Sequence, residues 1–573
     1  MKQNLGAPHS RARSATSLAL SGSMLTAGAG VGTLASVLFI GLASPAGAAT
    51  FTVSNLNDSG AGSLRQAITD ANVASGADTI DFGPGVTGTI TLGSDFPQIT
   101  ESLTIVGPGS DALTLSGAGS HHVFSLDTGG NGTVSLSGVT VTNSVGAAGT
   151  GDGGAIDAVN TNVILDEVVL TNNAIDTNQA SGGALSVKNL AGAGNVSITN
   201  SALSHNSARS APGGETKSGG AFLTADDITI ASTRIDHNDA DFVGGLVAYA
   251  NNVLTMTNTT IADNSGAAVV GGLATSAATT IISDSVITGN TSTGSVGGAY
   301  ILGFSFANYG VGTVAITTTR ISNNTGSVVG GAFIEAGGSP VGSDQDANIF
   351  DRLTVTDNIS TNTSGTSTAV GGLVVSMIGK ATIANSTISN NSGIGLNLLG
   401  SSIAPGSVPA SLSSSAISAP HELTLSHSTV SGNSRQGISA GISLYTASTP
   451  SAVAPGFDGT LTLNHALVAG NGIEDVAIPA TAVFSLIQKP NSSLIIGTGT
   501  LTGVDPDLKP LESISPTVSV VPITIGSAAW NAGNPNFLPP PATDQRGMPR
   551  VVDIIDIGAY EIQEPFILPR FTG

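Results

Sequence analysis

The stretch TADDITIASTRIDHNDADF, residues 224–242, is the strongest candidate for acid–base chemistry in this chain. Carboxyl groups held close together can share the roles of general acid and general base, which hydrolysis of a glycosidic bond requires. The stretch supplies five of them: Asp226, Asp227, Asp236, Asp239 and Asp241. The same positions flank turns, where Asp, Asn and His are favoured by the backbone. We expect this structural role and assign no catalytic residue.

Histidines recur at matching places in a repeated pattern, His205 with His237 and His427 with His465. If the repeats stack, each pair of rings comes within about 5 Å, the spacing of neighbouring strands. A metal site needs more ligands than two imidazoles, and no third ligand recurs in register. The chain has no Cys, which excludes disulfides and thiolate metal sites. We therefore predict no metal site and no cofactor.

A short aromatic stretch, GFSFANYGVG at residues 303–312, contains Phe304, Phe306 and Tyr309. Aromatic rings on an exposed loop can stack on sugar rings, so these three are candidate binding residues. Packing of the rings over a neighbouring repeat is the favoured alternative.

The elements that would position these residues come from a phrase that the sequence repeats. Ten copies align on an Asn: Asn173, Asn206, Asn238, Asn264, Asn290, Asn324, Asn358, Asn391, Asn433 and Asn471. The residues eight and three positions earlier are apolar in all ten copies, as in Ile316 and Ile321 before Asn324. The residue five positions earlier is Ser or Thr in seven: Ser201, Thr233, Thr259, Ser285, Thr319, Ser386 and Ser428.

A second phrase, Gly-Gly followed by an apolar residue, lies between the copies and begins at residues 153, 182, 219, 244, 271, 297, 330 and 371. Each unit thus combines short β-branched strands with a Gly-Gly corner and an Asn corner. We predict an all-β fold, a right-handed parallel β-helix in which each unit is one coil and inward aliphatic residues stack.

The corner residues have distinct predicted roles. Asn is expected to adopt the left-handed backbone conformation and to hydrogen-bond along the stack. Gly-Gly is expected where a Cβ would clash. A β-propeller is the alternative, but a chain with one Trp and 4% aromatic residues offers too few aromatic positions for its blades.

The first 49 residues are predicted to be a signal peptide. They carry a basic start, an apolar core at residues 31–43 and small residues before Thr50, with a membrane anchor as the alternative. Cleavage near Ala48 or Ala49 would leave 14 Lys and Arg against 38 Asp and Glu, a formal charge of −24. Such an acidic protein repels polyphosphate, so nucleic acid is excluded as a partner.

The two ends of the predicted stack need covers, because an open coil edge promotes aggregation. Residues 50–100 are predicted to form an N-terminal cap with the first strands. Ser63 and Gln66 fit a capping box on a short helix whose apolar stripe includes Leu64 and Ile68. Residues 101–500 are predicted to be coils, and residues 501–573 a C-terminal cap. Residues 401–420 and 445–459, rich in Ser, Pro and Ala, are predicted to be projecting loops.

Two segments resemble a known group of proteins. The run from FTVSNLNDSGAGSLRQAI at residue 51 to LTIVGPG at residue 103 resembles the opening of secreted bacterial surface proteins with pectin-lyase-like parallel β-helices. The segment with Asp-Gln-Arg-Gly at 544–547 and Asp-Ile-Gly-Ala-Tyr-Glu at 556–561 resembles their closing choice-of-anchor segment. LPRFTG at 568–573 is one residue too long for a sortase LPxTG site. The resemblance implies a secreted or cell-surface protein.

The expected function is that of an adhesin-like scaffold that binds glycans or protein surfaces, as a monomer without a membrane span in the mature chain. The alternative is a polysaccharide lyase or glycoside hydrolase acting on acidic polysaccharide. A protein with a net charge of −24 and few, scattered cations would repel a polyanionic substrate. We therefore predict binding without cleavage.

Overall fold

The computed structural model describes residues 47–563 apart from 131, 147–152, 176–180, 190–193, 210–217, 306–309, 338–347, 363–368, 378, 401–420, 441–456, 458, 492–493 and 552. The chain divides into two units, Met1–Ser44 and Pro45–Gly573, and the described residues all belong to the second. Phe306, Tyr309, the loop at 401–420 and most of the loop at 445–459 lie outside the described residues.

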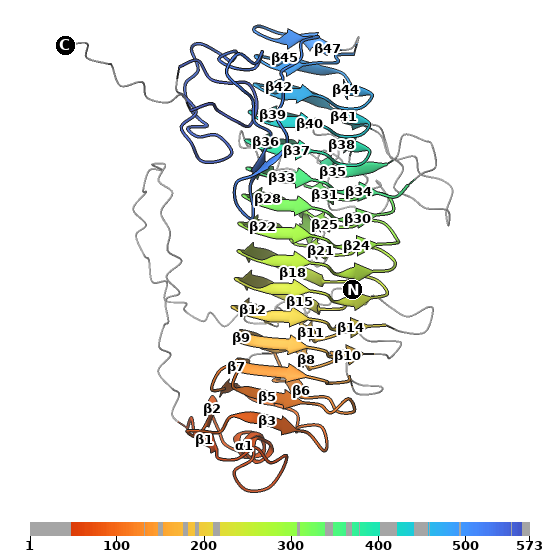
Figure 1. Cartoon of the computed structure of the whole chain (residues 1–573). Coiled ribbons are helices and arrows are strands. Elements are labelled where there is room, and N and C mark those ends of the chain that lie inside the picture. The colour runs from red at the N-terminus through yellow and green to blue at the C-terminus, as the bar shows by residue number, and fades with distance from the viewer. Residues whose placement is uncertain are drawn as a thin grey trace, which may run out of the picture. The chain divides into compact units, whose positions relative to one another are not determined.

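The second unit is a right-handed parallel β-helix (Figure 1). One coil shows its plan. After Gly219–Gly220, β15 (Ala221–Ala231) forms face 1, then bends at a bulge between Ala225 and Asp227 and continues as face 2. β16 (Arg234–Asp236) forms face 3, and the short β17 (Asp239–Ala240) forms face 4. Equivalent strands of successive coils pair in parallel, so the predicted fold is confirmed.

The strands of each face succeed one another along the stack. Face 1 comprises β6 (Phe124–Asp127), β8 (Ile156–Val159), β11 (Leu185–Lys188), the first parts of β15 and β18 (Leu246–Thr257), β21 (Leu273–Ser276), β25 (Ala299–Leu302), β31 (Ala332–Ala336), β35 (Val370–Met377), β38 (Ile394–Gly400), β41 (Gln436–Ala440) and β44 (Glu474–Val476). Face 2 comprises β1 (Thr50–Val53), β2 (Asp78–Phe82), β4 (Leu103–Val106), the first parts of β7 (Thr133–Thr142) and β9 (Asn162–Thr171), β12 (Val196–Thr199), the second parts of β15 and β18, β22 (Thr279–Ser283), β28 (Thr313–Thr317), β32 (Asn348–Asp351), β36 (Lys380–Ala384), β39 (Glu422–Ser426), β42 (Thr460–Asn464), β45 (Ala480–Val483) and β47 (Leu494–Ile496).

The other two faces are built from shorter strands. Face 3 comprises β3 (Gly88–Thr91), β5 (Leu113–Ser116), the second parts of β7 and β9, β13 (Ala202–Ser204), β16, β19 (Thr260–Ala262), β23 (Val286–Thr288), β29 (Arg320–Ser322), β33 (Thr354–Thr356), β37 (Thr387–Ser389), β40 (Thr429–Ser431), β43 (Leu467–Ala469), β46 (Leu486–Ile487) and β48 (Leu501–Thr502). Face 4 comprises β10 (Ala174–Ile175), β14 (Ser207–Ala208), β17, β20 (Ser265–Gly266), β24 (Thr291–Ser292), β30 (Thr325–Gly326) and β34 (Ile359–Ser360). Two antiparallel pairs stand apart, β26 (Phe304–Ser305) with β27 (Gly310–Val311) and β49 (Glu512–Ser513) with β50 (Ser519–Val520).

The core consists of inward aliphatic residues in register. Ile230 pairs with Met256, Met256 with Ile282 and Ile282 with Ile316, and all four are 0% exposed. Burial of one such side chain contributes roughly 1.5–3 kcal/mol. The repeated apolar positions of the sequence are therefore the continuous core of the stack.

The repeated Asn residues form a ladder along the corner between faces 3 and 4. The Nδ2 of Asn264 donates to the Oδ1 of Asn290 at 2.9 Å and to the carbonyl oxygen of Ile235 in the preceding coil at 2.9 Å. The same pattern runs from Asn173 to Asn471, with amide–amide distances of 2.9–3.1 Å. The last amide donates to the Asp475 carboxylate at 2.8 Å, which ends the ladder with a group that only accepts. The predicted bonding between Asn amides is confirmed.

The predicted left-handed conformation of these Asn residues is wrong by one position. Positive φ angles occur at the residue before the ladder Asn, as at His237 (53°) and Asp263 (53°). A second set precedes the Ser/Thr position, as at Ser232 (49°) and Asn258 (47°). The ladder Asn has to turn its amide into the stack, so the chain makes its sharp turn at the neighbouring residue.

The Gly-Gly corner is closed to side chains. A Cβ built on Gly271 would lie 2.4 Å from the carbonyl oxygen of Gly297 in the next coil, and one on Gly244 would lie 2.4 Å from that of Gly271. The glycines recur because adjacent coils approach too closely for any larger residue.

Helix α1 (Leu64–Ala71) packs on β1 and β2 at the N-terminal end of the stack, with Leu64 and Ile68 both 0% exposed. The Oγ of Ser63 accepts a hydrogen bond from the backbone N–H of Gln66 at 3.2 Å. The Gln66 side chain donates instead to Asp70, so one half of the expected capping box forms.

The C-terminal segment, residues 505–563, packs against the outer side of face 3 (Figure 1). The Oγ1 of Thr387 donates to Gln545 at 2.5 Å, and the backbone N–H of Ala559 donates to Thr429 at 3.0 Å. A small cluster of Leu467, Ala469, Leu486, Ile523, Ala529 and Ile557 joins the segment to the coils. Its described contacts are lateral, and its role as a terminal cap stays a prediction.

Candidate functional site

The acidic stretch at 224–242 is distributed over three places on its coil. Asp226 and Asp227 lie at the bulge between faces 1 and 2. The Nδ2 of Asn251 donates to Asp226 at 2.8 Å, and the backbone N–H of Val253 donates to Asp227 at 3.2 Å. Both contacts reach the next coil, so these carboxylates link neighbouring coils.

The other three aspartates have different partners. On face 3, Asp236 accepts from Arg234 at 3.0 Å and lies 2.6 Å from the Nδ1 of His237. On face 4, Arg209 binds Asp239 through two nitrogens and lies 3.9 Å from Asp241. The five carboxylates therefore take part in hydrogen bonds and ion pairs at three separate places, and the structure does not gather all five at one site.

Both predicted histidine pairs stack. The ring centroids are 4.9 Å apart for His205 and His237, and 4.7 Å apart for His427 and His465. The first pair lies near the surface, where the His237 side chain is 45% exposed. The second is buried beneath Phe537 of the C-terminal segment. Within the described ranges, no group of three or more His, Cys, Asp or Glu residues is arranged to hold a metal ion.

The outer surface of face 1 is the feature that sequence reasoning missed. Strand alternation places Ala221, Leu223 and Ala225 in the core, so Phe222 and Thr224 between them point outward. The outward positions of later coils carry Val247, Tyr249, Ala274, Tyr300, Phe333 and Val374, which form a second apolar cluster separate from the core. In the six Gly-Gly phrases from residue 219 onward, the outward residue follows Gly-Gly-Ala or Gly-Gly-Leu. In the phrases at 153 and 182 the same position holds Ile156 and Leu185, which point into the core, so its direction could not be known from the sequence.

Two aromatic pairs lie on this surface. Phe222 and Tyr249 meet edge to face with centroids 6.0 Å apart, and Tyr300 stacks on Phe333 at 5.0 Å. The Nζ of Lys188 lies 6.0 Å from the Phe222 ring. Burial raises the pKa of Tyr249. A tyrosine hydroxyl is protonated at neutral pH even at its ordinary pKa, and it can donate a hydrogen bond. Phe222, Tyr249 and Tyr300 are partly exposed, and together they offer ring surfaces beside polar groups.

Face 1 is bordered by the connections that vary most in length. Between faces 1 and 2 the chain uses residues 277–278 in one coil and residues 401–421 in another. Between faces 3 and 4 it keeps a short turn, such as His237–Asn238. Loops of variable length on a rigid scaffold are where binding residues concentrate. Phe304, the described member of the predicted aromatic loop, lies on such a connection, in β26.

Two carboxyl groups also point to the outer side of face 1, Asp157 on β8 and Glu335 on β31, and both are largely buried there, at 7% and 9% exposed. Six strand spacings separate β8 from β31, or about 29 Å. The carboxyl groups of a glycosidase stand roughly 5–10 Å apart. Asp157 and Glu335 therefore cannot act as one acid–base pair.

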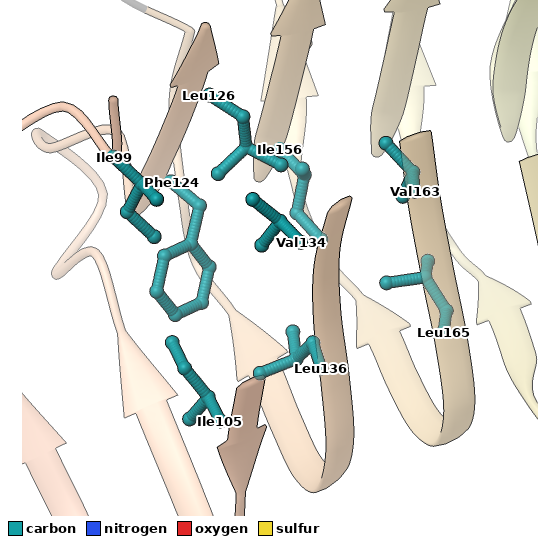
Figure 2. A pocket seen from close by; sticks show the side chains of 9 residues that line it. All are labelled: Ile99, Ile105, Phe124, Leu126, Val134, Leu136, Ile156, Val163 and Leu165. Carbon is teal, nitrogen blue, oxygen red and sulfur yellow. The ribbon is translucent and has the colours of Figure 1, made fainter. Parts of the chain in front are cut away.

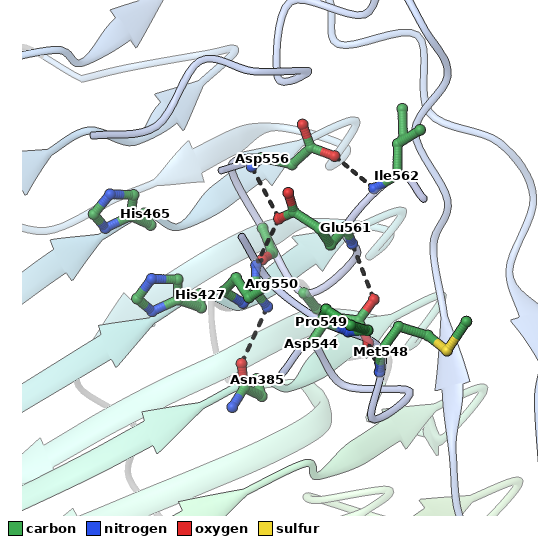
Figure 3. A network of polar contacts seen from close by, with 12 residues as sticks. Asn385, His427, His465, Asp544, Met548, Pro549, Arg550, Asp556, Glu561 and Ile562 are labelled. Atoms are coloured by element: carbon green, nitrogen blue, oxygen red, sulfur yellow. Dashed lines mark hydrogen bonds and ion pairs between the residues drawn. The ribbon is translucent and has the colours of Figure 1, made fainter. Parts of the chain in front are cut away.

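The residues that carried the family resemblance form a buried ionic network in the C-terminal segment (Figure 3). Asp544, 0% exposed, accepts from Arg546 at 2.7 Å and from the backbone N–H of Glu561 at 3.1 Å. Arg550, also 0% exposed, lies 3.6 Å from Glu561 and donates to Asn385 of the coils at 3.1 Å. The Arg546 guanidinium lies 3.6 Å from the centre of the Tyr560 ring. The motif residues therefore hold the segment together, and the segment is tied to the coils by Arg550, which lies between the two parts of the motif, and by Gln545 within it.

Burial shifts the acid–base equilibria of this network. Desolvation raises the pKa of Glu561 to about 8 and that of Asp556 to about 6. Beside the network, burial and the Arg550 charge lower the pKa of His427 to about 2 and that of His465 to about 4. The Nε2 of His465 accepts from the backbone N–H of Asn534 at 3.1 Å, which requires an unprotonated nitrogen. The segment is thus docked on neutral imidazoles.

A small cavity lies inside the core near the N-terminal coils (Figure 2). It measures about 10 Å³ and its nine lining residues, among them Ile105, Phe124 and Leu136, are all apolar. A space this small holds about one water at most, and apolar walls offer that water no partners. It is a packing defect and not a ligand site.

No helix among the described residues has the length and hydropathy needed to cross a bilayer. No family model and no curated protein matches the sequence.

Solved structures with a similar fold are enzymes by their titles. The mannuronan C-5 epimerase AlgE6 A-module of Azotobacter vinelandii is 11% identical, with 78% of this chain and 99% of that chain covered and a TM-score of 0.38. The catalytic unit of the GH87 α-1,3-glucanase of Streptomyces thermodiastaticus is 15% identical over 80% of this chain and 70% of that one, with a TM-score of 0.40. The periplasmic alginate epimerase AlgG is 12% identical over 79% and 84%, with a TM-score of 0.31. These similarities concern the stacked-coil architecture alone.

Proposed function

We propose that this chain is an exported protein that binds a glycan along the outer surface of face 1. The observation that carries the proposal is the row of partly exposed rings, Phe222, Tyr249 and Tyr300, which the strand register holds on one surface. Rings fixed on a sheet provide flat apolar platforms for sugar rings, and neighbouring hydroxyl groups fix the orientation of the sugar.

The charge of the protein favours an uncharged glycan. The formal net charge is −21 for the whole chain. Lys188 places its cation over the Phe222 ring on the outer side of face 1. Two acidic residues, Asp157 and Glu335, point to the same side. A polyanion such as a polyuronate would be repelled along most of this surface.

The test is a binding measurement with neutral and acidic polysaccharides by affinity electrophoresis or calorimetry. Tyr249→Ala and Tyr300→Ala should each weaken binding of a neutral glycan about tenfold, as loss of one good ring contact implies. The matched control is Ile281→Ala, which removes an outward apolar residue from face 2 that is 38% exposed. Equal affinity of all three variants would contradict the proposal.

Chemical processing of the bound glycan is the second candidate, favoured by the carboxyl group of Glu335 beside the Tyr300–Phe333 pair on face 1. The protein would be incubated with neutral glycans, pectate and alginate, with and without Ca²⁺, and assayed for new reducing or unsaturated ends. Product that disappears in Glu335→Gln would establish an enzyme. Binding without product supports the scaffold, which is the simpler function for a surface without a close carboxyl pair.

A further inference from the structure

The last coil of the stack leaves the core open. β47 pairs with β45 in the register Ala480 to Leu494 and Ala482 to Ile496. Ala480 and Ala482 are core residues, 3% and 0% exposed, so Leu494 and Ile496 point into the stack as well. Ile496 is nevertheless 56% exposed, because no described coil lies beyond it. An inward residue with this exposure marks the uncovered end of a core.

β47 also lacks the usual protection of an edge strand. Its outward residue, Ile495, is 63% exposed, and no described strand pairs with its far side. Natural edge strands are blunted by charges, by Pro or by a covering element. Residues 490–504 contain no charged residue, and β47 itself has no Pro. The C-terminal segment is placed on face 3, where its described hydrogen bonds to the coils are made, and leaves β47 uncovered.

The opposite end cannot serve as the partner surface. There α1 covers β1 and β2, and Leu64, Ile68 and Val53 are each 0% exposed. Arg65 fixes the preceding loop through Asp58 at 2.6 Å. Head-to-tail stacking of two molecules is therefore blocked, and what remains is contact between two identical open ends, which a two-fold axis relates.

We propose that the open C-terminal end is an interface between two copies of this chain, with β47 of one copy antiparallel to β47 of the other. The pairing would satisfy the main-chain groups of both edges and remove Ile495 and Ile496 of each copy from water. Two molecules with strong negative charge approach best through a segment without charge, and residues 490–504 provide it. The proposed dimer differs from the monomer that we expected from the sequence.

The test is the molar mass of the protein with its C-terminus intact to Gly573, by light scattering and sedimentation equilibrium. We expect a dimer at micromolar concentration that is favoured by salt, because screening reduces the repulsion between the two bodies. Ile495→Lys and Ile496→Lys should each give a monomer with unchanged far-ultraviolet circular dichroism. The matched control, Ile281→Lys, places the same charge on the outer side of face 2 and should remain a dimer.

A second measurement separates this partner from other occupants. Hydrogen exchange of the β47 amides should slow as protein concentration rises. Concentration-independent protection that is lost on deletion of residues 564–573 would mean that the chain covers its own end, which would overturn the proposal. A wild-type monomer with unprotected β47 amides, or a dimer that persists in Ile496→Lys, would overturn it too.

Discussion

The two ends of the coil stack differ in how far the apolar core is covered from water. At the N-terminal end an amphipathic helix lies over β1 and β2, and its apolar residues are fully buried. At the C-terminal end the longest non-coil segment of the described chain lies along the side of face 3, and β47 leaves Ile496 56% exposed. The described residues of this repeat protein therefore cover one end of the stack and leave the other end exposed.

The difference has a chemical basis in the two segments. Residues 63–71 have an apolar stripe at helical spacing and a side-chain cap, so the segment folds locally and presents one face to the first coil. Residues 505–563 contain buried charges that need partners, among them Asp544 and Arg550. The polar corner residues of face 3, such as Asn385, provide such partners, and the apolar open end does not.

The largest effect is expected from a charge placed in the N-terminal cover. Ile68→Asp would bury an unpaired carboxylate and should lower the free energy of unfolding by about 4 kcal/mol, with aggregation on warming. Ile496→Asp at the opposite end should cost less than about 1 kcal/mol in a monomer, because the site is already wet. Urea denaturation at low protein concentration measures both. Equal losses would remove the distinction between the ends.

The Asn ladder offers a comparison between a middle rung and an end rung. Asn324→Ala removes the acceptor for two donors of Asn290 and the donors to Ile287 and Asn358. The free energy of unfolding should fall by about 3 kcal/mol, since several buried groups lose their partners. Asp475→Asn keeps an acceptor for Asn471 at the end of the ladder and should cost about 1 kcal/mol. A larger loss at Asp475 would show that the ladder depends on its terminal charge.

The docking of the C-terminal segment should depend on pH in two opposite directions. Glu561 has a raised pKa of about 8, so its contribution is present at lower pH and is lost as pH rises through 8. His427 and His465 have lowered pKa values of about 2 and 4. Their contribution is present above the ordinary value of about 6.5 and declines as pH falls below it. Docking should be strongest near pH 6–7.

The single tryptophan, Trp530, packs against the docked cluster, so its fluorescence during urea titration is the measurement that should follow this transition. Replacing both His427 and His465 with Phe should remove the decline on the acid side and leave the alkaline side unchanged. Persistence of the acid decline in that variant would assign it to other groups.

The smallest effect concerns where the mature chain begins. The backbone nitrogen of Ala49 lies 2.7 Å from Oδ1 of Asp78, a carboxylate that is 2% exposed and whose Oδ2 has no hydrogen-bond partner. Cleavage before Ala49 would turn this nitrogen into an ammonium group and give the buried carboxylate a counter-charge. We expect mass spectrometry of the secreted protein to find Ala49 at its start. A mature chain beginning at Thr50 or later would lose this contact, and an uncleaved chain would refute the signal peptide.

Sequence reasoning succeeded where one position has one role in every coil. The apolar pairs, the Gly-Gly corner and the stacked His427–His465 rings all followed from repetition. It failed where direction matters, because left-handed residues lie beside the ladder Asn and Tyr249 points outward by alternation. The lateral position of residues 505–563 could not be foreseen either, since it depends on partners such as Asn385 that are far away in the sequence.

The ladder has a further consequence for how this molecule can change in evolution. Asn264 and Asn290 are 26 residues apart and Asn391 and Asn433 are 42 apart, yet both pairs meet with amide distances of 2.9–3.0 Å. Insertions between two ladder Asn residues therefore do not change the spacing of the coils along the stack. The distance between two rings along face 1 is set by the number of coils that separate them, so it is a whole multiple of the coil spacing. Gain or loss of one coil would change the length of the stack by a single strand spacing, about 4.8 Å, and would leave the spacing between all other neighbouring coils unchanged.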